Sequence, residues 1–496
     1  MGVLRVRAGS RWWSGLAICC ALALGGPSAA QANPLLEQLG SPTGLDGLGA
    51  RLFGGDAAAA YFNPAHLVAV GRQVSVGLVV VHQALEVELG ARPESVAIDD
   101  SIYRAREIEA DGTSSRMVLR PLPTARITQA RGSHDNGGSI TALELGGAIP
   151  LVAERLAVGF HLVMPLDAFQ SLGTYFVDER EQYFSNSLHF ERQVDLGRAF
   201  QVAFGVGWAP FDFLRLGAGF SMATGSEVMS DIYIPDAADQ ETAAVNSHLT
   251  LTTRFVPHLG VELLPLEGLR VSGTVHLAVE NEIRGEGRIQ FWNYDYPDGQ
   301  DALYQPFAFT YGYLPLRLSM AAVYERAQEG WSWGVGLGGT WAQWSAYRNR
   351  QQEAPLRSWS DVVESTLGGR VTAGGHHWSL AVRWAPSPVP DQVGRSNYVD
   401  NTKVGASLGW MWQIPLEAVD VSLGLQAQWQ QLLTRNVAKD LNAGDPVVDE
   451  YPDAVDVRTG APIPASAGFQ TNNPGYPGFR SSGWIASGGL QLKVAY

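Results

Sequence analysis

Arginine and histidine side chains recur at alternate positions of several extended segments, and arginine is well suited to bind a carboxylate. One guanidinium donates two parallel hydrogen bonds to one carboxylate, so several arginines on one face could hold an acidic ligand. If the apolar positions of these segments face lipid, their polar positions line a lumen. The predicted lumen side chains are His161, Arg215, Arg254, His258, Arg270, His276, Arg317 and Arg383. The alternative is that they pair with acidic lumen residues such as Glu262 and Glu280.

Catalytic, cofactor and metal sites lack a matching motif. A serine hydrolase needs a serine beside a histidine base, and no G-x-S-x-G stands at a strand-to-helix turn. The glycines at 47–55 follow no strand, which argues against a nucleotide cofactor. The acidic residues at 293–301 and 445–456 do not follow the calcium-loop spacing. We therefore expect no enzyme, cofactor or metal, with an outer-membrane lipid hydrolase as an alternative.

Composition restricts the class of protein. The formal net charge is −14, and lysine occurs only at 403, 439 and 493. Nucleic-acid binding needs clustered basic residues, so we expect no nucleic-acid partner. The chain has 56 glycines and 15 tryptophans, and its mature part has no apolar run long enough for a transmembrane helix. These features favour a membrane β-barrel over a soluble secreted β-protein.

Residues 1–32 have the pattern of a cleaved secretory signal peptide. A basic start precedes a short apolar run at 16–24 and a small-residue cleavage site at 30–32. Both cysteines, Cys19 and Cys20, fall in this segment, so the predicted mature chain has neither a disulfide nor a reactive thiol. A lipid anchor on Cys19 is the alternative.

Alternation of apolar and polar residues predicts strands. At 419–430 the odd positions are apolar, whereas the even positions are Asp, Ser, Gly or Gln. Only a strand separates two faces with a period of two. The segment 482–496 repeats the pattern, and most segments alternate for about ten residues or more, as tilted membrane strands do.

The connections complete the prediction of an antiparallel transmembrane β-barrel of fourteen strands at 72–496. Tight turns alternate with long polar loops along the chain, which is typical of an outer-membrane barrel. The even number of strands places both termini on the periplasmic side. Three long segments, 247–264, 268–290 and 306–325, are each predicted as one strand.

The stretch GGDAAAAYFNPAHL at 54–67 stands apart from the strands. Four alanines favour a short helix, and Asn63 cannot continue it because proline follows. An acidic residue, small residues, an aromatic pair and then Asn-Pro-Ala resemble the hatch of the FadL/TodX family. That family comprises outer-membrane transporters for long-chain fatty acids and aromatic hydrocarbons. The matching residues are Asp56, Ala57 to Ala60, Tyr61, Phe62, Asn63, Pro64 and Ala65.

Further matches follow in the order of the family. WAQWSAY at 341–347 is similar to the end of a family strand, and SPVPD at 387–391 resembles a family loop. Tyr496 matches the terminal aromatic residue that the barrel-assembly machinery reads. The resemblance covers the predicted mature chain and implies that 33–71 form a small, mostly helical hatch, or plug, inside the lumen.

The resemblance also implies a ligand site and an exit. The expected ligand-binding residues are Leu35, Leu36, Phe62, Arg317, Trp344 and Arg350. A second head-group arginine near 222–230 has no clear counterpart, so the ligand is either a fatty acid or an uncharged hydrocarbon. In the family the exit interrupts the third strand, and the matching residues are Gly159, His161, Met164 and Pro165.

By this resemblance, the chain is expected to take up hydrophobic molecules by diffusion through a plugged barrel with lateral exit into the membrane. It would lie in the outer membrane of a Gram-negative-type cell as a monomer. Its expected partners are the hydrophobic ligand, outer-membrane lipid and lipopolysaccharide, and the barrel-assembly machinery. A general porin or structural barrel is the alternative within the same fold.

Overall fold

The structure is a computed structural model. It describes residues 35–90, 106–108, 115–117, 133–135, 138–166, 188–190, 192, 201–223, 227–235, 242–251, 254–291, 303–349, 352–417, 419–440, 445–447, 461, 473 and 475–496. The predicted signal peptide and Arg350 lie outside these residues.

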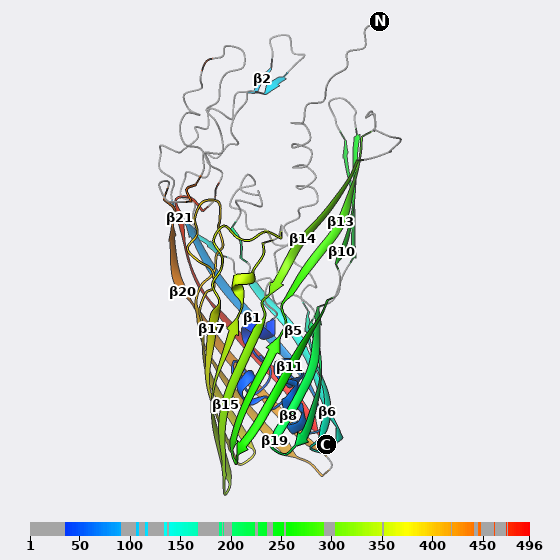
Figure 1. The fold of residues 1–496 in the computed structure, drawn as a ribbon, viewed down its shortest axis with the longest axis vertical. Coiled ribbons are helices and arrows are strands. Elements are labelled where there is room, and N and C mark those ends of the chain that lie inside the picture. The colour runs from blue at the N-terminus through cyan, green and yellow to red at the C-terminus, as the bar shows by residue number, and fades with distance from the viewer. Residues whose placement is uncertain are drawn as a thin grey trace.

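Fourteen antiparallel strands close into one barrel, as predicted (Figure 1). The barrel closes because β1 (Gln73–Leu89) pairs with the last strand, β21 (Gly478–Ala495), along its whole length. Between them around the wall lie β5 (Gly138–Val152), β6 (Leu156–Pro165), β7 (Gln201–Phe211), β8 (Leu214–Ala223), β11 (Arg254–Leu266), β12 (Leu269–His276), β15 (Arg317–Gln328), β16 (Trp331–Ala342), β17 (Val362–Ala373), β18 (His376–Ala385), β19 (Lys403–Pro415) and β20 (Asp420–Ala438).

A second sheet extends four neighbouring strands beyond the barrel wall (Figure 1). It consists of β9 (Glu227–Pro235), β10 (Thr242–Leu251), β13 (Val279–Phe291) and β14 (Leu303–Leu314). The remaining short strands are β2 (Arg106–Ile108), β3 (Ser115–Met117) and β4 (Ser133–Asp135).

The prediction of single strands at 247–264, 268–290 and 306–325 is wrong, because each segment contributes one strand to the barrel and another to the second sheet. Pro315, between β14 and β15, has no N–H to continue a ladder. The predicted strand at 330–347 also ends early, at Ala342, and a 3₁₀ turn follows at Trp344–Ala346.

The two faces of the wall differ as the alternation predicts. In β20 the exposed residues include Leu423, Leu425 and Trp429, whereas Gln426 and Gln428 are buried. β1 follows the same rule, with exposed and buried residues alternating over its first ten positions. The outer surface is therefore an apolar band, and the polar side chains point inward.

Four short helical segments precede β1, and we call residues 35–70 the hatch. They are α2 (Leu35–Leu39), α3 (Ala50–Phe53), α4 (Ala59–Phe62) and the 3₁₀ helix η1 (Pro64–Ala69). Figure 1 shows them in blue, enclosed by the strands. η1 packs against β7 and β8, and α3 packs against β15 and β16. None of the helices in the described ranges is long and apolar enough to span a membrane.

Side-chain caps shape the hatch motif. Asp56 accepts a hydrogen bond from the Ala58 amide at 2.9 Å, just before α4. Asn63 is extended and ends α4, and its side-chain oxygen accepts from the Ala65 amide at 3.1 Å. Its side-chain amide also donates to the carbonyl oxygen of Val261 in β11, at 3.3 Å. Asn63 therefore both turns the chain and attaches it to the wall.

Two histidines of the wall bind the last turn of α4. His258 of β11 and His276 of β12 stack with their ring centroids 4.9 Å apart. His258 Nε2 lies 2.7 Å from the carbonyl oxygen of Ala60, and His276 Nε2 lies 2.8 Å from that of Tyr61. Each ring can therefore donate to a carbonyl that the short helix leaves without a partner.

Wall glycines make room for the hatch backbone. A Cβ atom on Gly409 would overlap the carbonyl oxygen of Leu45, and one on Gly489 would overlap that of Pro42. These close approaches explain part of the high glycine content.

Gly489→Ala should therefore push the hatch away from β21. Overpacking of this kind costs about 1–3 kcal/mol, so the midpoint of thermal unfolding should fall and the steady current through single barrels should rise. Gly488→Ala is the matched control, because a Cβ on that outward-facing neighbour meets nothing within 4 Å. Equal behaviour of the two variants would mean that the hatch does not press on the wall here.

Candidate ligand-binding site

Glu37 is a hatch carboxylate buried against the wall. It lies in α2 and is 7% exposed. One Arg51 nitrogen donates to both carboxylate oxygens at 2.7 Å, and Arg317 of β15 forms an ion pair with the same group. The Tyr61 hydroxyl donates another hydrogen bond, at 2.5 Å. Glu37 thus connects α2 with α3, α4 and the wall.

The pKa of Glu37 depends on two opposing effects. Burial raises it because the carboxylate loses solvation, whereas the positive charges of Arg317 and Arg51 lower it. The arginines prevail, so the pKa of Glu37 lies well below its usual range and the group is ionised at neutral pH. Burial, followed by the charge of Glu37, raises the pKa of Tyr61, which keeps its hydroxyl as a donor.

Arg383 of β18 attaches the other side of α2. It donates to the carbonyl oxygen of Glu37 at 2.7 Å and forms an ion pair with Glu364 of β17. Arg192 lies 3.7 Å from Glu364 and 2.8 Å from Asp400. The buried guanidinium of Arg192 therefore bridges the carboxylates of Glu364 and Asp400, which come from distant parts of the chain.

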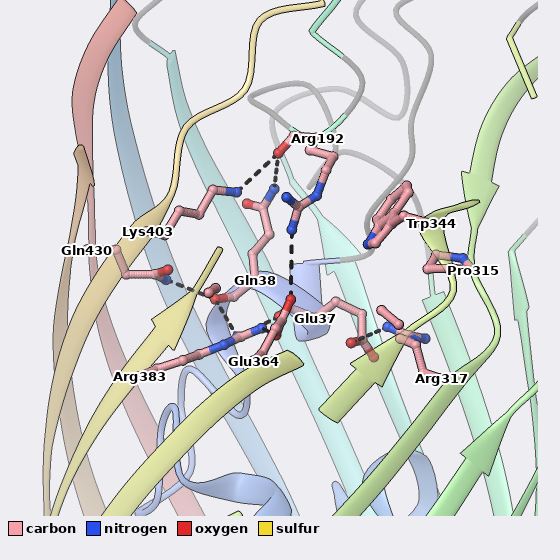
Figure 2. A pocket seen from close by; sticks show the side chains of 12 residues that line it. Glu37, Gln38, Arg192, Pro315, Arg317, Trp344, Glu364, Arg383, Lys403 and Gln430 are labelled. Carbon is pink, nitrogen blue, oxygen red and sulfur yellow. Dashed lines mark hydrogen bonds and ion pairs between the residues drawn. The ribbon is translucent and has the colours of Figure 1, made fainter. Parts of the chain in front are cut away.

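Amide and ammonium groups extend this network (Figure 2). Lys403 Nζ donates to the carbonyl oxygen of Arg192 at 3.3 Å, and the Gln38 side chain donates to the same oxygen at 3.1 Å. Gln430 donates to the backbone of Gln38 at 2.8 Å. β20 thus holds α2 directly, whereas Lys403 of β19 is linked to it through the carbonyl oxygen of Arg192.

These side chains surround a small cavity between α2 and the wall (Figure 2). Its free volume is about 20 Å³, enough for one water molecule, so an organic ligand requires side chains or the hatch to move. Four cationic side chains and two carboxylates line it, which leaves positive charge in excess. The charged lining residues are Arg192, Arg317, Arg383, Lys403, Glu37 and Glu364.

Apolar groups adjoin the cavity on the hatch. Leu35, Leu36 and Leu39 of α2 belong to a buried cluster that also contains Phe62. Inward-facing residues of β1, β5, β6, β7, β20 and β21 also belong to this cluster, as do Leu188 and Val399. The same short helix therefore presents a carboxylate to the cations and leucines to an apolar part of the lumen.

Aromatic rings form a second buried cluster near the cavity. Tyr347 and Trp359 stack with centroids 4.0 Å apart, and Tyr398 meets Trp359 edge-on. Trp344 belongs to this cluster and also lines the cavity, where the Arg192 guanidinium lies 5.1 Å from its ring centroid. The cavity thus has a charged side and an aromatic side.

The structure brings five of the six predicted ligand residues near α2. Arg317 and Trp344 line the cavity. Leu35, Leu36 and Phe62 lie in the apolar cluster. Arg350 lies outside the described residues, and ligand contact by any of the six stays a prediction.

Not all predicted lumen cations belong to this site. Arg215 and Arg270 form ion pairs with buried Glu262, at 2.6 and 3.2 Å, as in the alternative of internal pairing. His161 is buried, with its Nε2 4.0 Å from Glu144. These groups hold the wall and hatch together elsewhere in the lumen.

The third strand, β6, contains the residues of the predicted lateral opening. It pairs with β7 from Leu156 to Val163, and with β5 up to Pro165. A Cβ on Gly159 would meet the side chain of Leu67 in the hatch. β6 is paired on both sides from Leu156 to Val163. Met164 and Pro165 pair with β5, and the residues that precede β7 lie outside the described range, so an opening beside Met164 stays a prediction.

Several residues of the network were not predicted. Glu364 occupies an inward position of β17, so the alternation of the strand could have indicated it. Lys403 is one of only three lysines, so its rarity was the available signal. Glu37 gave no signal, because its partners are distant in sequence. In the described parts of the chain, no group of three or more His, Cys, Asp or Glu side chains is placed to hold a metal ion.

No protein-family model matches the sequence, and no curated protein matches it. Several solved structures are similar to the fold. A Pseudomonas aeruginosa FadL homologue has a TM-score of 0.49 and 13% identity, covering 95% of this chain and 97% of its own. The P. putida toluene transporter TodX has a TM-score of 0.42 and 10% identity, with coverages of 94% and 99%. The Ralstonia pickettii toluene transporter TbuX has a TM-score of 0.39 and 11% identity, with coverages of 91% and 98%.

The first two of these structures bear the names of the family that the hatch motif resembles. The likenesses are weak, so the fold rests on the strand pairing and the function is a proposal.

Glu37→Gln should loosen the hatch, because Arg317 and Arg51 lose their buried counter-charge. Breaking such a pair costs about 3–5 kcal/mol, which thermal unfolding of the purified protein would detect. Glu88→Gln is the control, because that carboxylate is 61% exposed and lies 3.9 Å from Arg480. An exposed pair contributes about 0–1 kcal/mol. Similar unfolding midpoints for the two variants would contradict the anchoring role of Glu37.

The pH dependence of the hatch should follow the pKa of Glu37. This pKa is lower than the ordinary value of 4.5, so the ion pairs contribute fully above about pH 4.5 and weaken as the pH falls through the folded value. Hydrogen exchange of residues 35–70 should therefore stay slow at about pH 5 and accelerate only in stronger acid. Release of the hatch between about pH 5 and pH 7 would contradict this assignment.

Proposed function

We propose that this chain carries hydrophobic molecules through the outer membrane, by diffusion through a plugged barrel with lateral exit into the bilayer. The observation that carries the proposal is the arrangement around α2. A cavity with excess positive charge adjoins an apolar cluster, and both are enclosed by a closed barrel. This combination suits a ligand with an apolar chain and an acidic head group.

The occupied lumen favours a transporter over a general porin. A porin conducts through an open aqueous lumen, whereas here residues 35–70 form hydrogen bonds and ion pairs with the wall from within. A structural barrel would not require charged groups around a cavity. Low steady conductance of the purified protein would support the plugged barrel, and a large open-channel current would favour a porin.

The charged lining favours a long-chain fatty acid over an uncharged hydrocarbon. Arginine and lysine bind carboxylates through charge-assisted hydrogen bonds. A toluene-like ligand would leave these cations without a new partner. The similar solved structures include both a FadL homologue and toluene transporters. The uptake experiment below therefore compares a fatty acid with an aromatic hydrocarbon.

Lateral exit follows from the chemistry of such a substrate. An apolar chain gains free energy by leaving water, so release into the bilayer is favourable, whereas passage along an aqueous pore is not. The apolar outer band of the wall would accept the molecule directly. We further propose a monomer in contact with outer-membrane lipid and lipopolysaccharide, assembled by the barrel-assembly machinery through Tyr496.

Uptake of labelled oleate and labelled toluene, by cells with and without the protein, tests the proposal. We expect protein-dependent oleate uptake. Lys403→Met should weaken oleate binding roughly tenfold, the effect of losing one charge-assisted hydrogen bond, and should leave toluene uptake unchanged.

Lys493→Met is the matched control, because Lys493 lines a different cavity, toward the end of β21. Oleate uptake that is equal with and without the protein would overturn the proposal. Hydrolysis of a lipid ester by the purified protein would instead favour the hydrolase.

A further inference from the structure

The barrel wall is unpaired along part of the boundary between its sixth and seventh strands. The ladder between β11 and β12 ends where His258 lies opposite His276. The next pair along these two segments of chain is Leu251 of β10 opposite Ile283 of β13. In the described part of this interval, 254–257 and 279–282 form no ladder with each other.

The two neighbouring boundaries are paired over most of the same level. β11 continues to pair with β8 up to Arg254 opposite Ala223. On the other side, the β12–β15 ladder ends at His276, two residues are unpaired, and pairing of the seventh and eighth strands resumes at Val279 opposite Leu314. The gap therefore lies between the sixth and seventh strands, and each of these strands is paired with its other neighbour beside the gap.

The local backbone explains why the ladder opens here. Pro257 has no N–H to donate to the ladder. One long hydrogen bond crosses the seam, from the Leu277 amide to the carbonyl oxygen of Pro257, at 3.4 Å. A register shift in the β13–β14 ladder follows Asn281 at nearly the same level. Bulges of this kind often end strand pairing at barrel rims.

The outside of this seam is apolar. Phe255 is 63% exposed and Leu277 is 46% exposed, and they flank the seam on its two strands. Leu318 of the eighth strand is also exposed. A molecule that left the lumen here would therefore enter an apolar surface.

The inside of the seam is closed by side chains alone. Val256, Val279 and Leu314 form a small buried apolar cluster, to which the two strands that border the seam each contribute one residue. Leu314 directly precedes Pro315, which lines the cavity beside Arg317. Among the described residues, opening the seam breaks the long hydrogen bond between Leu277 and Pro257 and shifts these three side chains, whereas parting an intact ladder breaks several hydrogen bonds.

We infer that the hydrophobic substrate leaves the barrel through this seam, between Pro257 and Leu277. The inference rests on the proposed function and specifies the exit. It differs in place from the opening expected beside the third strand, where β6 is paired on both sides from Leu156 to Val163. The substrate would pass from the cavity beside Arg317, past Leu314 and Val279, to the lipid surface.

A reversible cross-link tests the route. The only two cysteines are in the predicted signal peptide, so Pro257→Cys with Leu277→Cys introduces a unique pair across the seam. Phe160→Cys with Phe204→Cys is the matched control, because these exposed residues are opposite partners across the β6–β7 boundary. Each single substitution controls for the loss of the native side chain. If oxidation alone does not link the two cysteines of a pair, a reducible bifunctional thiol reagent links them instead.

We expect closure of the seam pair to lower oleate uptake at least fivefold, and reduction of the disulfide to restore it. The control pair should leave uptake unchanged when closed. Normal uptake with the seam verified as closed would overturn the inference, and selective loss in the control pair would place the exit beside the third strand. If the reduced variants and the unmodified protein all fail to take up oleate, the proposed function itself is wrong.

Discussion

A polypeptide inside a barrel must find a partner for each of its buried charges, and the carboxylate of Glu37 imposes this constraint most strongly here. It lies in a helix of five residues, with Arg51, Tyr61 and Arg317 around it. Without these cations, an ionised carboxylate would be unstable at such a buried position. The position of α2 therefore depends on charges supplied by both the hatch and the wall.

The same constraint produces the candidate site. The wall supplies more cations near α2 than the carboxylates neutralise, and the excess faces a cavity bordered by leucines and aromatic rings. Histidines from β11 and β12 satisfy the end of α4, and glycines let the hatch backbone approach the strands. Attachment of the hatch and the proposed recognition of a ligand thus use one set of side chains.

The barrel could be predicted because its signal is local and repeated. The alternation at 419–430 separates two faces of a strand independently of the rest of the chain. Asn63-Pro64 is likewise a local signal, because it marks the end of a helix without reference to distant residues. The division of the predicted strand 268–290 was missed, because Leu277 and Ala278 continue an ordinary strand sequence. Glu37 was missed because its partner Arg317 is distant in sequence. Such pairings are set by tertiary structure.

The most direct test of this account is a crystal structure with a fatty acid that carries bromine on its chain. We predict that the carboxylate lies between Arg317, Arg383 and Lys403, and that the bromine gives anomalous density against Leu35 and Leu36. Density confined to the outer surface of the barrel, with the cavity unchanged, would contradict the assignment of this site.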